Sequence, residues 1–248
     1  MKDTIRAEWR KLRTTRTGKG LLAATVALTA LGAWGTLHEM GPATSTASTI
    51  AALPLFLLAT WSVSILAMVL GIRSVTDEVR HGSLVPTLLA TPDRRRVVGA
   101  KLAVAGAAGA VLGLAAIATG TAFAMIWTAT HGGMLALGGT AFAILTVKVA
   151  AVGAAWAAIG LGIGLIVRHQ VAAIVGALVY LFVVEDLIGG LFDGVAKFLP
   201  GSAADAFIGM SAGGAELVAP VVGAMLLAGY AALSMGVGTE RLVRGDIS

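Results

Sequence analysis

Cysteine is absent from this chain, and charged residues are scarce. Without cysteine the chain cannot form a disulfide framework, a thiol nucleophile or a thiolate metal site. Only 12% of its 248 residues are charged, whereas a soluble domain of this size carries about 25%. Hydrophobic residues make up 57% and the mean hydropathy is +0.90. This balance excludes an ordinary soluble fold, because too few polar side chains remain to cover the surface.

The hydrophobic residues gather in six long runs. These runs are 20–37, 50–72, 102–129, 137–167, 171–192 and 217–238. A helix needs about 20 residues to cross ~30 Å of hydrocarbon, so each run can span a membrane. The 33 glycines fit this interpretation, because membrane helices use small residues to pack closely. We expect an all-α membrane protein with six transmembrane helices in a single domain, 1–248.

Basic residues are distributed unevenly over this six-span topology. All but two of the 18 Lys and Arg residues fall on one side, the exceptions being Lys148 and Lys197. The positive-inside rule places the basic side, and with it both termini, in the cytoplasm of a multi-pass plasma-membrane protein. The same bias accounts for the net charge of +5, so we do not expect nucleic-acid binding.

The first nineteen residues, 1–19, form a basic arm ahead of the first run. Ile5, Trp9 and Leu12 fall on one helical stripe, with arginines beside it. The stripe predicts an amphipathic helix that lies in the membrane interface. About twenty residues with two acids precede the apolar stretch, which argues against a cleaved signal peptide.

A dense, mostly basic segment, 73–101, separates the second and third runs. Thr76–Arg80 can continue the second helix until Gly82 stops it, and Asp93 can cap the helix that enters the third run. Between these ends the sequence predicts a short apolar helix that Ser83 caps and that contains Leu84, Val85, Pro86, Leu88 and Leu89. Such a helix either docks on a partner or lies on the bilayer, and its residues alone favour neither.

Two motifs and their order resemble the permease subunit of ATP-binding-cassette (ABC) type-2 exporters of bacteria. The motifs are EWRKLRT at Glu8–Thr14 and DEVRHGSLVPTLLATPDRRRVVGAK at Asp77–Lys101. The family pattern is matched in order by Glu78, Gly82–Leu84, Leu88–Leu89, Pro92, Arg94–Arg96 and Lys101. The family more often has Thr at the position of Ser83, and Pro86 is unusual in its short helix. The likeness covers nearly the whole chain, including a long extracytoplasmic connection, 193–216.

The resemblance implies that 73–101 holds a coupling helix that docks on a separate ATPase subunit. The contacts that it implies are Asp77, Glu78, Arg80, Gly82, Ser83, Leu84, Leu88 and Leu89. It also implies a dimer with a second permease copy or homologue, and export of a hydrophobic or amphipathic drug, peptide or lipid. The chain has no G-x-x-x-x-G-K-[ST] motif, so we expect ATP and Mg²⁺ on the partner and no cofactor on this subunit.

Three charged residues inside apolar runs are candidates for a transport pathway or gate. Lys148 lies about 30 Å of helix before Arg168, so it can also snorkel to the outer interface. Glu185 and Asp186 lie about 21–23 Å into the fifth run, where acids are costly unless they face water, protein or a counter-charge. The alternative, which the sequence favours, is a structural role at a helix break near Gly189–Gly190. We further hypothesise that Lys148 is their counter-ion.

Other patterns have weaker functional meaning. No metal site is expected, because the four histidines fall in four different connections. The pairs Gly109/Gly113 and Gly160/Gly164 predict close packing between spans. Pro200 can begin a short helix in the 193–216 connection. Two alternatives remain open: an ion-coupled carrier or channel, and a non-transporting immunity or scaffold protein.

Overall fold

The computed structural model describes residues 2–40, 52–83, 93–131, 139–210 and 217–244. These residues are helical almost throughout and contain no β-strand. Six helical stretches are long and apolar enough to cross a membrane, which confirms the expected all-α, six-span fold. Five of them are single helices: α2 (Arg16–Met40), α4 (Ala52–Arg80), α6 (Arg94–His131), α7 (Gly139–Val167) and α12 (Pro220–Arg244).

The fifth span is built from three consecutive helical pieces. These are α8 (Gln170–Val179), the π-helical turn η1 (Tyr180–Val184) and α9 (Glu185–Leu191). A π turn inserts an extra residue into a helix and rotates the next turns about the helix axis, and such turns often occur near functional residues. The π turn therefore lies just before Glu185, and the span ends at Leu191, directly after the glycine pair near which the sequence allowed a helix break.

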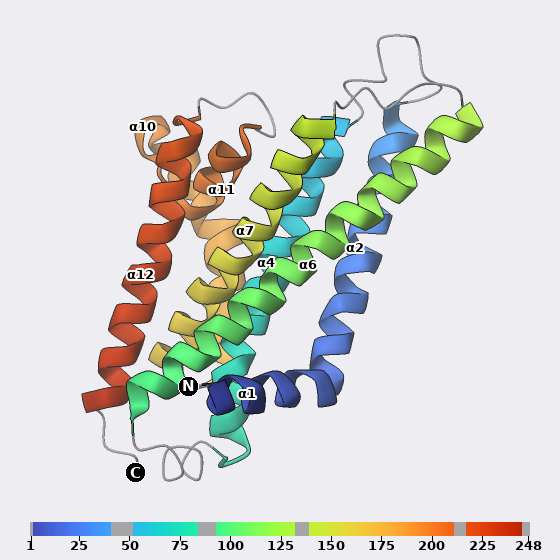
Figure 1. The fold of residues 1–248 in the computed structure, drawn as a ribbon. Coiled ribbons are helices and arrows are strands. Elements are labelled where there is room, and N and C mark those ends of the chain that lie inside the picture. Colours follow the sequence, from blue (N-terminus) through green and yellow to red (C-terminus); the bar gives the residue numbers. More distant parts are fainter. Residues whose placement is uncertain (1, 41–51, 84–92, 132–138, 211–216, 245–248) are drawn as a thin grey trace.

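Helix α7 lies at the centre of the bundle, packed against α4, α6 and α12 (Figure 1). Glycines make this packing close. A Cβ on Gly109 would overlap the carbonyl oxygen of Gly153, and one on Gly160 would overlap that of Met68. The predicted role of both small-residue pairs, packing spans within the bundle, is thus confirmed for α6–α7 and α4–α7.

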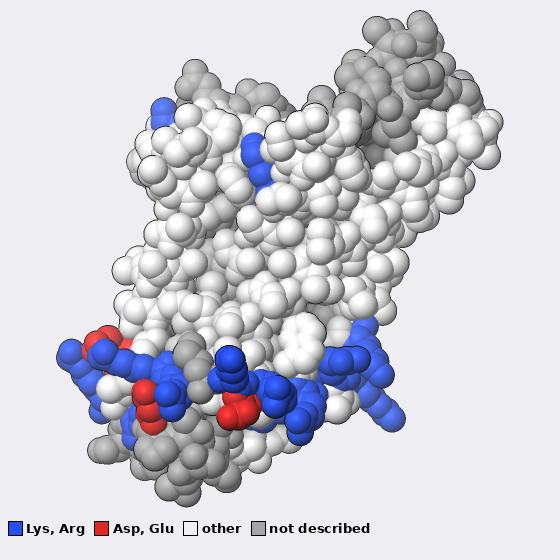
Figure 2. All heavy atoms as spheres, viewed as in Figure 1, with Lys and Arg blue, Asp and Glu red and all other residues white. Residues whose placement is uncertain are grey.

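The two ends of the bundle differ in charge. Lys and Arg gather in a band across one end (Figure 2), where α1 (Lys2–Thr14) lies crosswise beneath the spans (Figure 1). The short helices α10 (Asp193–Ala196) and α11 (Pro200–Ile208) lie at the opposite end. Helix α11 begins at Pro200, as predicted. The uneven distribution of basic residues that the sequence predicted is therefore present in the folded molecule.

Candidate functional site

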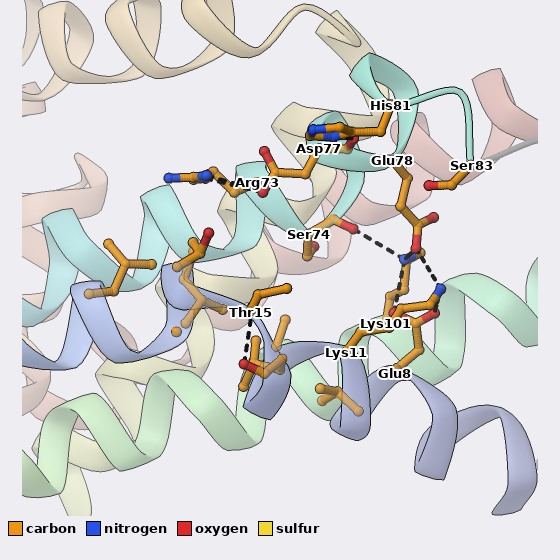
Figure 3. Close-up of a pocket in the computed structure, with 17 residues that line it drawn as sticks. Glu8, Lys11, Thr15, Arg73, Ser74, Asp77, Glu78, His81, Ser83 and Lys101 are labelled. Atoms are coloured by element: carbon orange, nitrogen blue, oxygen red, sulfur yellow. Dashed lines mark hydrogen bonds and ion pairs between the residues drawn. The ribbon is translucent and has the colours of Figure 1, made fainter.

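Four charged side chains join α1 to α4 and α6 at the basic end of the bundle. Lys101 Nζ lies 2.9 Å from Glu8 Oε2 and 2.7 Å from Glu78 Oε1. Lys11 Nζ lies 2.9 Å from Glu8 Oε1 and 2.8 Å from Glu78 Oε1. Each lysine thus bridges both glutamates (Figure 3). We call these four residues the ionic cluster.

Most of the ionic cluster is buried. The side chain of Lys101 is 2% exposed and those of Glu8 and Glu78 are 9% and 10% exposed, whereas Lys11 is 47% exposed. Lys101 also donates to the carbonyl oxygen of Ser74 at 3.1 Å, so three oxygen atoms surround its ammonium group. Two cations and two anions cancel, which makes the burial of this much charge tolerable.

The cluster shifts the pKa values of its α1 members. Burial opposes the charge on Glu8, but Lys101 and Lys11 together hold the pKa of that carboxyl below its ordinary value. Burial also opposes the charge on Lys11, yet its bonds to Glu78 and Glu8 raise the pKa of the ammonium group. Both shifts favour the charged forms, so Glu8 and Lys11 are ionised over the neutral range.

Local helix signals place Glu78 and Lys101. Helix α4 ends at Arg80, Gly82 takes a left-handed φ of 66°, and Ser83 N–H donates to the Glu78 carbonyl oxygen at 2.9 Å. Helix α6 begins at Arg94, where Asp93 Oδ1 accepts the N–H of Arg96 at 3.1 Å. The predicted stop and cap are confirmed. The 84–92 segment therefore lies between two helices, α4 and α6, that the ionic cluster joins.

A cavity of about 340 Å³ opens beside the ionic cluster (Figure 3). Its walls come from α1, α2, α4 and α6 and include Leu12, Leu21, Arg73 and Asp77. Glu78 Oε2 is buried and has no hydrogen-bond partner in the described part of the chain. The cluster thus retains one unused acceptor.

The other residues that the family resemblance implied as ATPase contacts lie outside the ionic cluster. Asp77 pairs with Arg73 along α4 at 3.3 Å, and Arg80 donates to Gln170 Oε1 at 3.4 Å. Glu78 faces the protein interior rather than solvent. Leu84, Leu88 and Leu89, and with them the predicted short helix, lie outside the described residues. Sequence reasoning did not find the pairing of Glu8 and Lys11 with Glu78 and Lys101, although all four belong to the two quoted motifs.

Two of the three charged candidates within the spans, Lys148 and Glu185, contact α11. Glu185 Oε1 accepts the N–H groups of Gly201 at 2.7 Å and Ser202 at 3.2 Å. Lys148 Nζ donates to the Ile208 carbonyl oxygen at 3.2 Å. No ion pair joins Lys148 to Glu185, so the counter-ion hypothesis is wrong, and Asp186 is exposed on the outer face of α9.

Comparison with known families matches residues 4–184 to the model described as ABC-2 family transporter protein. This chain belongs to the ABC-2 transporter family. The match includes all four residues of the ionic cluster and extends to the end of η1, so it stops just before Glu185. The chain is therefore a multi-pass permease of an ABC transporter, a class of subunit that works with an ATP-binding partner. No curated protein matches it.

Proposed function

We propose that this permease exports a hydrophobic or amphipathic substrate, driven by a separate ATPase that binds the 84–92 segment. The observation that carries the proposal is the ionic cluster, which ties both flanks of that segment to α1. ATP and Mg²⁺ would bind the partner, and a second permease copy or homologue would complete the pathway. The basic end of the bundle would face the cytoplasm.

The cluster provides a route for mechanical coupling. A force on 84–92 would act on α4 and α6 through the backbone, and the ion pairs of Glu78 and Lys101 with Lys11 and Glu8 would pass it to α1. Because both glutamates and Lys101 are largely shielded from water, separating them costs more than breaking an exposed ion pair. The three helices would therefore move together. Helices α4 and α6 pack directly on α7, so that motion would reach the centre of the bundle.

Co-purification and ATPase measurements test the proposal. The chain is purified gently from its host as parent, as the double variant Leu84→Arg/Leu88→Arg, and as Lys101→Met. Val243→Arg, an exposed apolar position near the end of α12, is the matched control. We expect an ATPase with a G-x-x-x-x-G-K-[ST] motif to accompany the parent, Val243→Arg and Lys101→Met, and to be lost from the double variant. Hydrolysis by the Lys101→Met complex should no longer respond to transport substrates.

Failure of a monodisperse parent chain to bring down any ATPase would overturn the proposal. Orientation is tested separately, and the absence of cysteine makes single-cysteine labelling free of background. Lys197→Cys should react with a membrane-impermeant maleimide on intact cells, whereas Arg13→Cys should react only after permeabilisation. The reverse pattern would contradict the cytoplasmic placement of the basic end.

A further inference from the structure

A small, partly open cavity lies where α11 packs against α4 and α7. Its volume is about 10 Å³, close to the space that one water molecule occupies by this measure. Its wall is mostly apolar but includes polar groups of Thr60 and Ser64 of α4, Trp156 of α7, and Asp205 of α11. The family match ends before α11, and the proposed function uses none of these residues.

Hydrogen bonding in this cavity is unbalanced. Trp156 is 2% exposed, and its indole N–H has no partner in the described part of the chain. The hydroxyl groups of Thr60 and Ser64 already donate along α4, each at 2.8 Å, so only their lone pairs remain free. The carboxyl group of Asp205 has no hydrogen bond or ion pair to any described residue. Among the described residues that line the cavity, the buried donor without a partner is therefore the Trp156 N–H, which faces a surplus of acceptors.

Acidic groups also outnumber basic groups around Asp205. The acidic neighbour is Glu185 of α9, whose Oε2 is also buried without a partner among the described residues. The cavity-lining residues of α4 and α7 carry no charge, and Lys148 of α7 is bound at the far end of α11. The other titratable groups that act on Glu185 are Asp186 of α9 and the phenols of Tyr180 in η1 and Tyr230 in α12, of which Tyr230 donates to the Phe198 carbonyl oxygen.

We propose that this cavity is a binding site for one proton and one water molecule, with the proton on Asp205. Glu185 uses its charge to accept two N–H groups at the start of α11, whereas Asp205 has no donor to stabilise an anion. A protonated Asp205 supplies a further donor to a cavity in which acceptors are in surplus. The water accepts the Trp156 N–H and donates to the free acceptors. Burial, and then the negative charge of Glu185, raise the pKa of Asp205 to about 7, in agreement with this assignment.

Protonation would control how firmly α11 rests on α4 and α7. The pKa of Asp205 is raised in the folded protein above its ordinary 3.8, so the folded state holds the proton more tightly. The stabilising effect is complete below about pH 4 and is lost as the pH rises toward 7. Loss of the proton would loosen the end of the permease opposite the ionic cluster. The inference concerns this chain alone and does not depend on ATPase coupling.

The test compares three forms of the full-length chain in detergent: parent, Asp205→Asn and Asp186→Asn. Asparagine at 205 keeps the shape of the carboxyl group and is a permanent neutral donor, and Asp186 is an exposed carboxyl nearby that serves as the matched control. Melting temperature is measured between about pH 5 and pH 8. We expect the parent and Asp186→Asn to lose stability as the pH rises. Asp205→Asn should have a flatter profile and be the most stable form at the alkaline end.

Infrared spectroscopy gives a readout that does not depend on stability. The parent and Asp186→Asn should show the carbonyl band of a buried carboxylic acid that titrates near pH 7 and is missing from Asp205→Asn. Absence of that band from the parent, or equal pH slopes for all three forms, would overturn the proposal. Recovery of the parent's stability at alkaline pH by Na⁺, but not by choline, would also overturn it, since the site would then hold a metal cation.

Discussion

Glu185 and Lys148 hold opposite ends of the same short helix. The Glu185 carboxylate accepts backbone N–H groups at the start of α11, and the Lys148 ammonium group donates to the Ile208 carbonyl oxygen at its end. A helix dipole is stabilised by an anion at its amino end and a cation at its carboxyl end. Two charges within apolar spans thus orient a third element instead of neutralising each other.

This arrangement predicts that Lys148→Met loosens the carboxyl end of α11. The variant loses a charged hydrogen bond and the dipole interaction, a cost of about 1–2 kcal/mol. Hydrogen exchange at the backbone amides of 205–209 should accelerate. Lys197→Met is the control, since the described contact of Lys197 is only the ring of Phe198. Similar exchange in both variants would show that Lys148 does not hold α11.

The ionic cluster predicts a larger effect for Lys101→Met. Methionine keeps the volume of the buried side chain but leaves Glu8 and Glu78 facing each other with only the half-exposed Lys11 between them. Removing one partner of a buried pair costs about 3–5 kcal/mol. Thermal unfolding in detergent measures the loss, with the exposed Lys19→Met as control. Adding Glu78→Gln should recover part of the stability, and a purely additive double variant would contradict the coupling.

The attachment of α1 should depend on pH in a defined way. The pKa of Glu8 is depressed below its ordinary 4.5, so its contribution is present above that value and is lost as the pH falls through the folded pKa. The pKa of Lys11 is raised above 10.5, so its contribution is present below that value and is lost as the pH rises through the folded pKa. A spin label at Arg13→Cys should therefore become mobile only at the two extremes. Glu8→Gln should weaken the acid step, and label mobility that varies across neutral pH would contradict this account.

Close packing of α6 on α7 predicts that changing glycine to alanine has different effects on stability at two positions of α6. A Cβ on Gly109 would meet the backbone of Gly153, whereas one on Gly106 would meet open space. Gly109→Ala should therefore destabilise the protein by about 1–3 kcal/mol. Gly106→Ala should be neutral or stabilising by up to about 1 kcal/mol, because alanine favours the helix. Equal melting temperatures for the two variants would show that α6 can move away from α7 without cost.

Helix ends were predictable because their signals are local. Gly82 and Asp93 stop and start helices through their own backbone geometry and neighbouring N–H groups, and Pro200 begins α11 for a similar reason. The place of the helical irregularity in the fifth span was not predictable in this way. Its π turn at Tyr180–Val184 contains no glycine or proline.

The sequence showed that certain charged residues need a partner, but it did not show which residues those partners are. Burial makes a partner necessary for Glu8, Glu185 and Lys148, but each of them has several candidates at similar depth. Glu8 pairs with Lys101 across 93 positions, and Lys148 reaches a backbone carbonyl 60 positions away instead of Glu185. The charges on one helix say nothing of which neighbour will face them.

Composition and order along the chain alone determined the six spans, the basic end, the helix boundaries around 84–92 and the family. These properties depend on hydrophobic length, on charge asymmetry and on backbone chemistry within a few residues. Only the tertiary structure decided that Glu8, Lys11, Glu78 and Lys101 form one cluster, and that Asp205 lines a water-sized cavity with Trp156. The physical reason is that these contacts depend on how the helices rotate and approach one another, which the glycine contacts on α7 set in three dimensions.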